Sequence, residues 1–153
     1  MEEISKVIVF QLKNEQFGVE IQQVISIERL QNVTEVPQTA PFIKGVINLR
    51  GDITPIIDLK ERLRIGKTEY TGDARVLIVR INTLQVGFIV DSATDVKDID
   101  PSIIDSPPKM IGGVTEDYIT GVAKLEEKLL ILLDLEQVLN TEELNEVKEV
   151  VED

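Results

Sequence analysis

The chain contains neither histidine nor cysteine, so its reactive side chains are carboxylates, lysines and arginines. Serine–histidine–aspartate catalysis, cysteine–histidine catalysis and the common zinc sites all need a residue type that is missing. Asp58 and Asp134 could be imagined as the carboxylate pair of a glycosidase. Each of them, however, precedes a leucine at a position where a short side chain can cap a helical turn, and we favour that structural role. The sequence therefore predicts no catalytic residue and no cofactor.

A second group of carboxylates is Asp95, Asp98 and Asp100, which are spaced somewhat like oxygen ligands for calcium. A calcium-binding EF-hand loop requires a glycine at its sixth position and a glutamate at its twelfth. Neither is present, and Pro101 follows at once. We interpret these residues as a solvated acidic loop and predict no metal site.

The third candidate is Arg50, which with Gly51 and Asp52 interrupts an apolar stretch running from Phe42 to Leu59. The tripeptide matches the sequence that cell-adhesion receptors recognise in extracellular ligands. Such a match of three residues arises often by chance, and an extracellular ligand would need a secretory signal and usually disulfides. An arginine in a turn can instead be a contact for a partner protein, because guanidinium is enriched at interface hot spots.

The composition indicates what kind of protein must position these residues. At 153 residues the chain is long enough for one domain with a core of its own. A net charge of −12 disfavours nucleic acid and anionic lipid surfaces as partners. The beginning is acidic where a secretory signal would be basic, and the longest apolar run is too short to cross a bilayer. We therefore predict a cytoplasmic protein without membrane insertion.

Short alternating apolar segments bounded by turn residues dominate the chain and indicate β-strands. The segment from residue 95 to 117, rich in Asp, Pro and Gly, is predicted to be an irregular connection. Residues 60–63 and 136–139 are predicted to form short helical turns. Residues 140–153 carry apolar side chains at helical spacing and an acidic outer face, which predicts an amphipathic helix that covers a barrel.

An alignment of the chain with itself shows two ungapped matches in the same order. The segment that begins at Val7 matches the one that begins at Val76, and Gly18 then meets Gly87. The segment that begins at Phe42 matches the one that begins at Tyr118. Seven positions of the second match are identical: Ile43, Gly45, Val46, Leu49, Asp58, Leu59 and Leu63 have the same residue in the second half.

These matches favour two similar halves, about residues 4–66 and 74–139, over chance similarity between β-rich segments. About five short strands in each half suit a small barrel, which has no exposed sheet edges. We predict a mainly β protein made of two barrels side by side. Because Arg50 aligns with Glu126, the architecture does not require arginine at this turn.

The segment PFIKGVINLRGDITPIIDL, residues 41–59, resembles the signature of the CheW family, the adaptors of bacterial chemotaxis arrays. That signature has the form F-I-x-G-V-x-N-L-R-G-x-I-x-P-V-x-D-L. The segments FGVEIQQVISI and VGFIVDSATDV also resemble family segments. The resemblance runs roughly from Ile4 to Leu139, and this combination of motifs is far more specific than any one of them.

The resemblance implies a single domain, residues 4–139, of two SH3-like five-stranded barrels without catalytic activity. CheW-type proteins couple the cytoplasmic tips of methyl-accepting chemoreceptors to the histidine kinase CheA. By this resemblance the receptor hairpin would lie in a groove between the barrels, and the kinase regulatory domain would pack on barrel surfaces. The expected location is the cytoplasm, at membrane-associated receptor arrays.

The resemblance also suggests which residues contact partners. Arg50, followed by Gly51, matches the family arginine associated with these contacts, and Val24, Ile27 and Gly87 match positions around the groove. Ser26 stands where many relatives have glutamate, so this chain lacks a carboxylate that could pair with Arg50 from that position.

Other functions remain open from the sequence. The chain could be a CheW-like adaptor of another chemosensory pathway, or the adaptor part of a larger protein with a receiver domain. A carboxylate-dependent enzyme using Asp58 or Asp134 is the alternative from a different class. A deep polar pocket holding both carboxylates would favour the enzyme, and a flat apolar groove would favour the adaptor.

Overall fold

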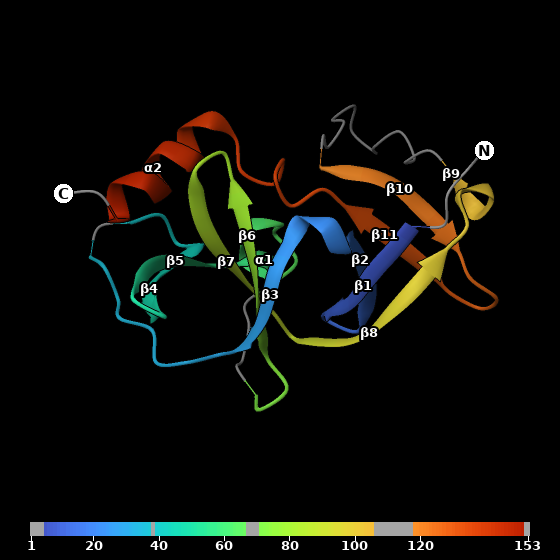
Figure 1. Ribbon diagram of the computed structural model, residues 1–153, viewed down its shortest axis with the longest axis horizontal. Coiled ribbons are helices and arrows are strands. Elements are labelled where there is room, and N and C mark those ends of the chain that lie inside the picture. The colour runs from blue at the N-terminus through green and yellow to red at the C-terminus, as the bar shows by residue number, and fades with distance from the viewer. Residues whose placement is uncertain (1–4, 38, 67–70, 106–117, 152–153) are drawn as a thin grey trace.

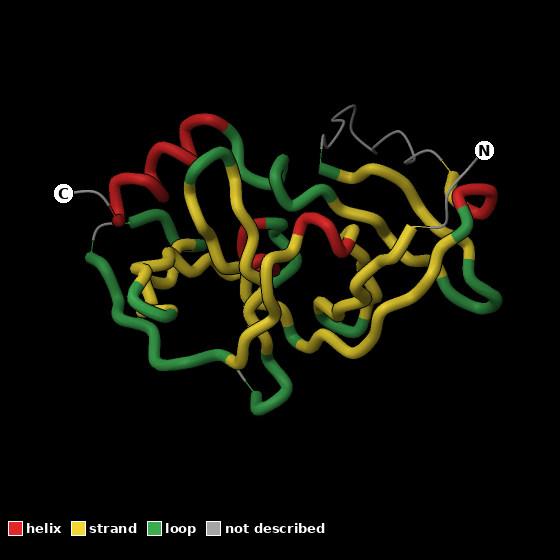
Figure 2. The backbone as a smooth tube through the Cα atoms, viewed as in Figure 1, coloured by secondary structure: helices red, strands yellow, loops and turns green. Residues whose placement is uncertain are grey.

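The computed structural model describes residues 5–37, 39–66, 71–105 and 118–151. It consists mainly of strands with a few short helices (Figure 2). The strands are β1 (Ser5–Leu12), β2 (Glu15–Glu20), β3 (Val24–Arg29), β4 (Ile43–Leu49), β5 (Asp52–Asp58), β6 (Arg75–Ile81), β7 (Leu84–Val90), β8 (Ser92–Ile99), β9 (Ile104–Asp105), β10 (Ile119–Lys124) and β11 (Leu129–Leu133). The helices are η1 (Ile21–Gln23), α1 (Leu59–Arg62), η2 (Pro101–Ile103) and α2 (Thr141–Val151).

The strands form two sheets that lie side by side (Figure 1). We call them the six-stranded barrel, with strand order β8-β1-β2-β11-β10-β9, and the five-stranded barrel, with strand order β3-β6-β7-β5-β4. In both barrels one hairpin strand pairs in parallel with a strand of the other sequence half, β2 with β11 and β7 with β5. The mainly β fold with two packed sheets and a C-terminal helix agrees with the prediction.

The two sheets do not follow the two sequence halves. The hairpin of β1 and β2 joins β8 to β11 of the second half, while the hairpin of β6 and β7 joins β3 to β5 of the first half. The assignment of residues 4–66 to one barrel and 74–139 to the other is therefore corrected: each barrel contains strands of both halves. The chain crosses between barrels at η1 and again at Asp91, between β7 and β8. The division of the chain between a domain ending at 139 and a separate tail stays a prediction.

Each barrel is closed by a segment that bends back onto its last strand. In the five-stranded barrel Thr34, downstream of β3, bridges Val46 of β4, with both backbone N–H···O distances at 2.9 Å. In the six-stranded barrel β9, downstream of β8, pairs with β10. Gly45 has φ of +145°, and a Cβ there would lie 2.1 Å from the Thr34 carbonyl oxygen. This close approach explains why glycine recurs at the aligned position of the other half, Gly121.

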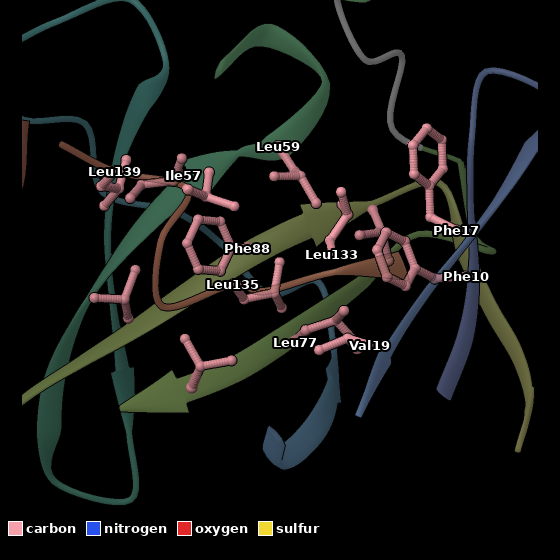
Figure 3. Packing of buried hydrophobic residues seen from close by; sticks show 14 of the residues in the cluster. Phe10, Phe17, Val19, Ile57, Leu59, Leu77, Phe88, Leu133, Leu135 and Leu139 are labelled. Atoms are coloured by element: carbon pink, nitrogen blue, oxygen red, sulfur yellow. The ribbon is translucent and has the colours of Figure 1, made fainter. Parts of the chain in front are cut away.

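Three apolar clusters form the interior. Neighbouring residues of β1, and likewise of β6, belong to different clusters, because successive side chains of a strand point to opposite faces. Val76 and Ile78 fill the five-stranded barrel, whereas Leu77 and Val79 belong to the largest cluster, which joins the two barrels. In this inter-barrel core, Phe10 and Phe17 stack with ring centroids 5.9 Å apart (Figure 3). Strands buried on both faces therefore lie at the centre of the molecule.

Polar contacts fix both crossings between the barrels. At η1 the Gln23 amide donates to Asp134 Oδ1 at 2.9 Å and accepts from the Leu135 N–H at 3.0 Å. At the other crossing, Asp91 accepts from Lys60 Nζ at 2.9 Å and from the Lys13 N–H at 2.7 Å. The Lys60 side chain is almost completely buried, so this ion pair lies within the packed region between the barrels.

The two predicted helical turns differ. Residues 59–62 form α1, which Asp58 caps by accepting from the Glu61 N–H at 3.2 Å. Residues 136–139 form bends rather than a helix, although Asp134 still accepts from the Glu136 N–H at 3.0 Å. The predicted capping role of the two aspartates is thus confirmed as local hydrogen bonding, with a helix after only the first.

Helix α2 covers β4 and β5 (Figure 1). Asn140 and Glu143 exchange side-chain and backbone hydrogen bonds of 2.8 and 2.9 Å, which is a capping box. Val147 is fully buried in the inter-barrel core, and Arg62 pairs with Glu143 at 2.9 Å. The apolar stripe of the helix therefore packs within the chain, as the sequence predicted.

Candidate partner-binding surface

The turn between β4 and β5 consists of Arg50 and Gly51, which we call the Arg50 turn. Both residues have positive φ, +52° and +92°, as a two-residue type I′ hairpin requires. The Asn48 Oδ1 accepts from the Gly51 N–H at 2.9 Å. Turn geometry thus explains Asn48 and Gly51. It does not explain Arg50, because the left-handed conformation costs a residue with a Cβ about 1–2 kcal/mol.

The aligned turn of the six-stranded barrel has a different backbone. Glu126 and Glu127 do not have positive φ, and the Leu125 N–H donates to the Lys128 carbonyl oxygen at 2.9 Å. The barrels therefore share the strands around this turn but not the turn itself.

Arg50 reaches from its turn to β3. Its Nη2 lies 3.3 Å from Glu28 Oε2. The two side chains differ in accessibility, since 72% of the Arg50 side chain is exposed and only 15% of the Glu28 side chain. The contact joins the Arg50 turn and β3 into one surface, although 22 positions separate the two residues in sequence.

Three of the predicted contact residues lie on β3. Val24 packs against the inter-barrel core, and a bulge follows it at Ile25. Ser26 lies opposite Ile78, and its buried hydroxyl makes no hydrogen bond to any residue that the structure describes. Ile27 lies opposite Leu77 and is 42% exposed at the border of the inter-barrel core. The structure therefore places Val24, Ser26 and Ile27 on one strand, and the Arg50 turn meets that strand through Glu28.

Gly87 lies apart from this surface. It is buried in β7, and a Cβ there would lie 2.6 Å from Val76 and 2.7 Å from Ile56, inside the five-stranded barrel. Its counterpart Gly18 has the same surroundings in the six-stranded barrel, with Val7 at 2.5 Å and Leu132 at 3.0 Å. Packing inside a barrel accounts for both glycines, so a direct partner contact by Gly87 receives no support from its position.

Exposed apolar residues near these positions were not predicted from the sequence. Ile53, the second residue of β5, is 52% exposed, and its aligned counterpart Leu129 is 59% exposed. Ile27 and its counterpart Val96 are likewise both exposed. The repeat alignment could have identified these pairs, because an apolar residue that recurs at an outward position needs a reason other than the core.

The carboxylates proposed for an enzyme do not share a pocket. Asp58 is buried as the cap of α1, while Asp134 contacts Gln23 at the crossing between barrels. Neither lines the surface hollows of about 340, 370 and 250 Å³. The two carboxylates thus serve separate local hydrogen bonds rather than one shared pocket.

The acidic residues of β8 and its end are used locally. Asp98 pairs with Lys6 at 3.1 Å. Hydrogen bonds from the Ser102 backbone N–H and side chain lower the pKa of Asp100, which caps η2. Within residues 5–37, 39–66, 71–105 and 118–151, no three His, Cys, Asp or Glu side chains are grouped so that they could hold a metal ion. The prediction of an irregular connection is wrong for residues 95–105, which form the end of β8, η2 and β9, and Asp95 and Asp98 lie on a strand rather than a loop. Residues 106–117 of that connection lie outside the described residues.

None of the helices in the described ranges is long and apolar enough to span a membrane.

Comparison with known proteins gives a consistent result. The family model described as a CheW-like domain matches residues 6–143. The chain is 40% identical over 137 residues to chemotaxis protein CheW of Bacillus subtilis, covering 90% of this chain and 88% of that protein. It is 36% identical to chemotaxis protein CheW of Klebsiella aerogenes, covering 90% and 82%. Its fold matches the crystal structure of the scaffolding protein TtCheW from Thermoanaerobacter tengcongensis with a TM-score of 0.81, 36% identity and coverage of 94% and 91%.

Proposed function

The chain belongs to the CheW family of non-enzymatic chemotaxis scaffold proteins, and from this we propose that it couples methyl-accepting chemoreceptors to the histidine kinase CheA. Its partners are the cytoplasmic tips of the receptors and the regulatory domain of the kinase. The proposal places the protein in the cytoplasm at membrane-associated receptor arrays.

The observation that carries this proposal is the Arg50 turn. Arg50 occupies a left-handed conformation that glycine or asparagine would adopt more easily, and its side chain is largely exposed. Exposed Ile53 follows it in the first residues of β5. A guanidinium near an exposed apolar side chain is typical of a protein interface.

Two further features support a scaffold. Both crossings between barrels are fixed by polar contacts, and the barrels share one apolar core. Contacts on different faces therefore stay at a fixed separation, which suits a protein that links two partners. Weak individual contacts become effective when many copies act together in an array.

A reconstituted assay tests the proposal. Purified CheA, a receptor with its cytoplasmic domain and the wild-type chain are combined, and kinase activity is measured with and without receptor ligand. We expect the chain to bring CheA activity under receptor control. If adding the chain produces no change in receptor control of CheA, the coupling proposal is wrong.

The substitution Arg50→Gln tests whether receptor–kinase coupling depends on the Arg50 turn. Glutamine removes the charge without placing a second carboxylate beside Glu28, which Arg50→Glu would do. Arg80→Gln is the matched control, because Arg80 is an exposed arginine of β6 in the same barrel. We expect Arg50→Gln to weaken coupling and Arg80→Gln to leave it close to wild type. Equal effects of the two substitutions would remove the assignment to the Arg50 turn.

A further inference from the structure

Glu28 is the acidic residue that contacts Arg50, and nothing in the sequence motifs singled it out. The Glu28 side chain is mostly buried, while that of Arg50 is mostly exposed, so the glutamate is the more fixed member of the pair. Among the described residues, neither side chain forms an ion pair with any other group. The pair is therefore a closed local unit formed by β3 and the Arg50 turn.

The position of Glu28 along β3 determines where Arg50 is drawn. Ser26 and Glu28 lie on the same face of the strand, opposite Ile78 and Val76. Within the described residues the Ser26 hydroxyl makes no hydrogen bond, so it does not accept from Arg50. Two positions along a strand correspond to about 7 Å. An acceptor at 28 thus holds the guanidinium toward the C-terminal end of β3, and none at 26 competes for it.

The pair leaves most of the guanidinium available. A guanidinium has five N–H donors, and within the described residues it donates one hydrogen bond, from Nη2 to Glu28. The backbone is fixed as well, since the type I′ turn and the Asn48 hydrogen bond set the direction in which the side chain leaves the turn. An arginine fixed at its base and held at one nitrogen presents its remaining donors with little loss of rotamer freedom on binding.

From this geometry we propose that Glu28 is the positioning residue of Arg50: it holds the guanidinium in the orientation in which its free donors bind a carboxylate of the receptor tip or the kinase. The inference rests on the proposed function and adds to it the residue that orients the contact and the chemistry of the partner group. Glu28 itself does not contact the partner.

The test is a double-mutant cycle of Glu28→Gln and Arg50→Gln, with binding of a soluble receptor cytoplasmic fragment and of CheA measured by titration. We expect Glu28→Gln to weaken binding about twofold to fivefold in the wild-type background, as for a partly exposed pair. In the Arg50→Gln background it should have no further effect, because no guanidinium remains to be oriented. Equal weakening in both backgrounds, or tighter binding in Glu28→Gln, overturns the inference.

A second measurement separates this inference from the proposed function. NMR of the free protein reports rotation of the Arg50 guanidinium, which we expect to be restricted in the wild type and free in Glu28→Gln, with Arg80 as an internal control. If the wild type binds neither fragment, the proposed function is wrong, while restricted rotation still establishes the orienting pair. Unrestricted rotation in the wild type overturns the positioning role whether or not the fragments bind.

Discussion

The five strands of the smaller barrel have counterparts in the same order in the larger barrel, which adds β9. The barrels differ at the turn that joins β4 to β5 in one and β10 to β11 in the other. In the five-stranded barrel this turn is the two-residue type I′ turn with Arg50, and in the six-stranded barrel it contains Glu126 and Glu127 without positive φ. Buried positions around the turn agree between the barrels, as Gly45 and Gly121 do. The comparison separates residues that the barrel needs from residues that it merely permits, and Arg50 belongs to the second group.

The largest expected difference between the barrels is in the loss of unfolding free energy when the glycine beside the closing segment is replaced. Gly45→Ala would force a Cβ against the Thr34 carbonyl at a φ that side chains rarely adopt, so we expect a loss of about 3 kcal/mol or more in unfolding free energy. Gly121→Ala meets Ile104 at 2.7 Å and the Asp105 carbonyl at 3.1 Å without a positive φ, and should cost about 1–2 kcal/mol. Urea unfolding measures both, with Gly72→Ala, which meets nothing within 4 Å, as the control. Equal losses at 45 and 121 would show that the two closures are equivalent.

The glycines inside the barrels should behave alike. Gly18→Ala and Gly87→Ala each meet a valine and two further apolar side chains, so we expect each to cost about 1–3 kcal/mol through overpacking. Urea unfolding of the two variants gives the comparison. A Gly87→Ala variant of wild-type stability that has lost partner binding would instead make Gly87 a contact residue, as the family resemblance suggested.

Ile53 and Leu129 are exposed at equivalent positions of the two barrels, so replacing each tests which barrel contacts the partner protein. We expect Ile53→Ser to weaken binding of the receptor fragment or of CheA by about 1 kcal/mol, because Ile53 lies beside the Arg50 turn. Leu129→Ser, at the equivalent position, should have the smaller effect on the partner that Ile53 contacts. Both variants should retain unfolding free energies within about 0.5 kcal/mol of the wild type. A larger effect of Leu129→Ser on that partner would contradict the assignment to the Arg50 turn.

Replacing Arg50 with asparagine tests the backbone of the turn. Asn-Gly is the preferred type I′ sequence, so Arg50→Asn should stabilise the hairpin. To exclude the effect of the lost ion pair, the substitution is made in the Glu28→Gln background, where we expect a gain of about 0.5–1 kcal/mol in unfolding free energy. The same variant should couple receptors to CheA poorly. No gain in stability would mean that arginine is under no strain in this turn.

The smallest effect concerns η2, which precedes β9 and has no counterpart before Thr34. Hydrogen bonds from Ser102 lower the pKa of Asp100 in the folded state. This contribution to stability is therefore present above the unfolded pKa of about 4 and is lost as pH falls through the lower folded value. Asp100→Ala should lower the urea midpoint slightly at about pH 7, and the difference should disappear at about pH 2. A difference independent of pH would assign the effect to the helix rather than the charge.

The sequence was sufficient to predict two barrels, because alternation and the internal repeat depend on local patterns. It could not predict the exchange of hairpins. The hairpins of β1–β2 and β6–β7 are equivalent, so either would fit either set of later strands. The contacts of Gln23 and Asp91 at the crossings fix the observed arrangement, and such contacts between distant residues are not visible in local patterns.

The candidate surface could be derived from the sequence only in part, and its role in binding stays a prediction. Arg50 was singled out because the repeat has glutamate at the same position, and residues of β3 were singled out by resemblance. Glu28 was missed, although alternation in VISIER places it on the same face as Ser26, because pairing across 22 positions is a tertiary contact. Gly87 was predicted at a groove, but the tight packing around it shows why the residue recurs in both halves.

The exchange of hairpins also determines how the protein must mature on the ribosome. The strands β1 and β2 leave the ribosome first, yet their parallel partner β11 is made near the end of the chain. The five-stranded barrel can close as soon as β7 has emerged, whereas the first hairpin must wait on the order of ten seconds at ordinary rates of translation. During that time its apolar face lacks its final partners. The first hairpin therefore stays incompletely paired for longer than any strand of the five-stranded barrel.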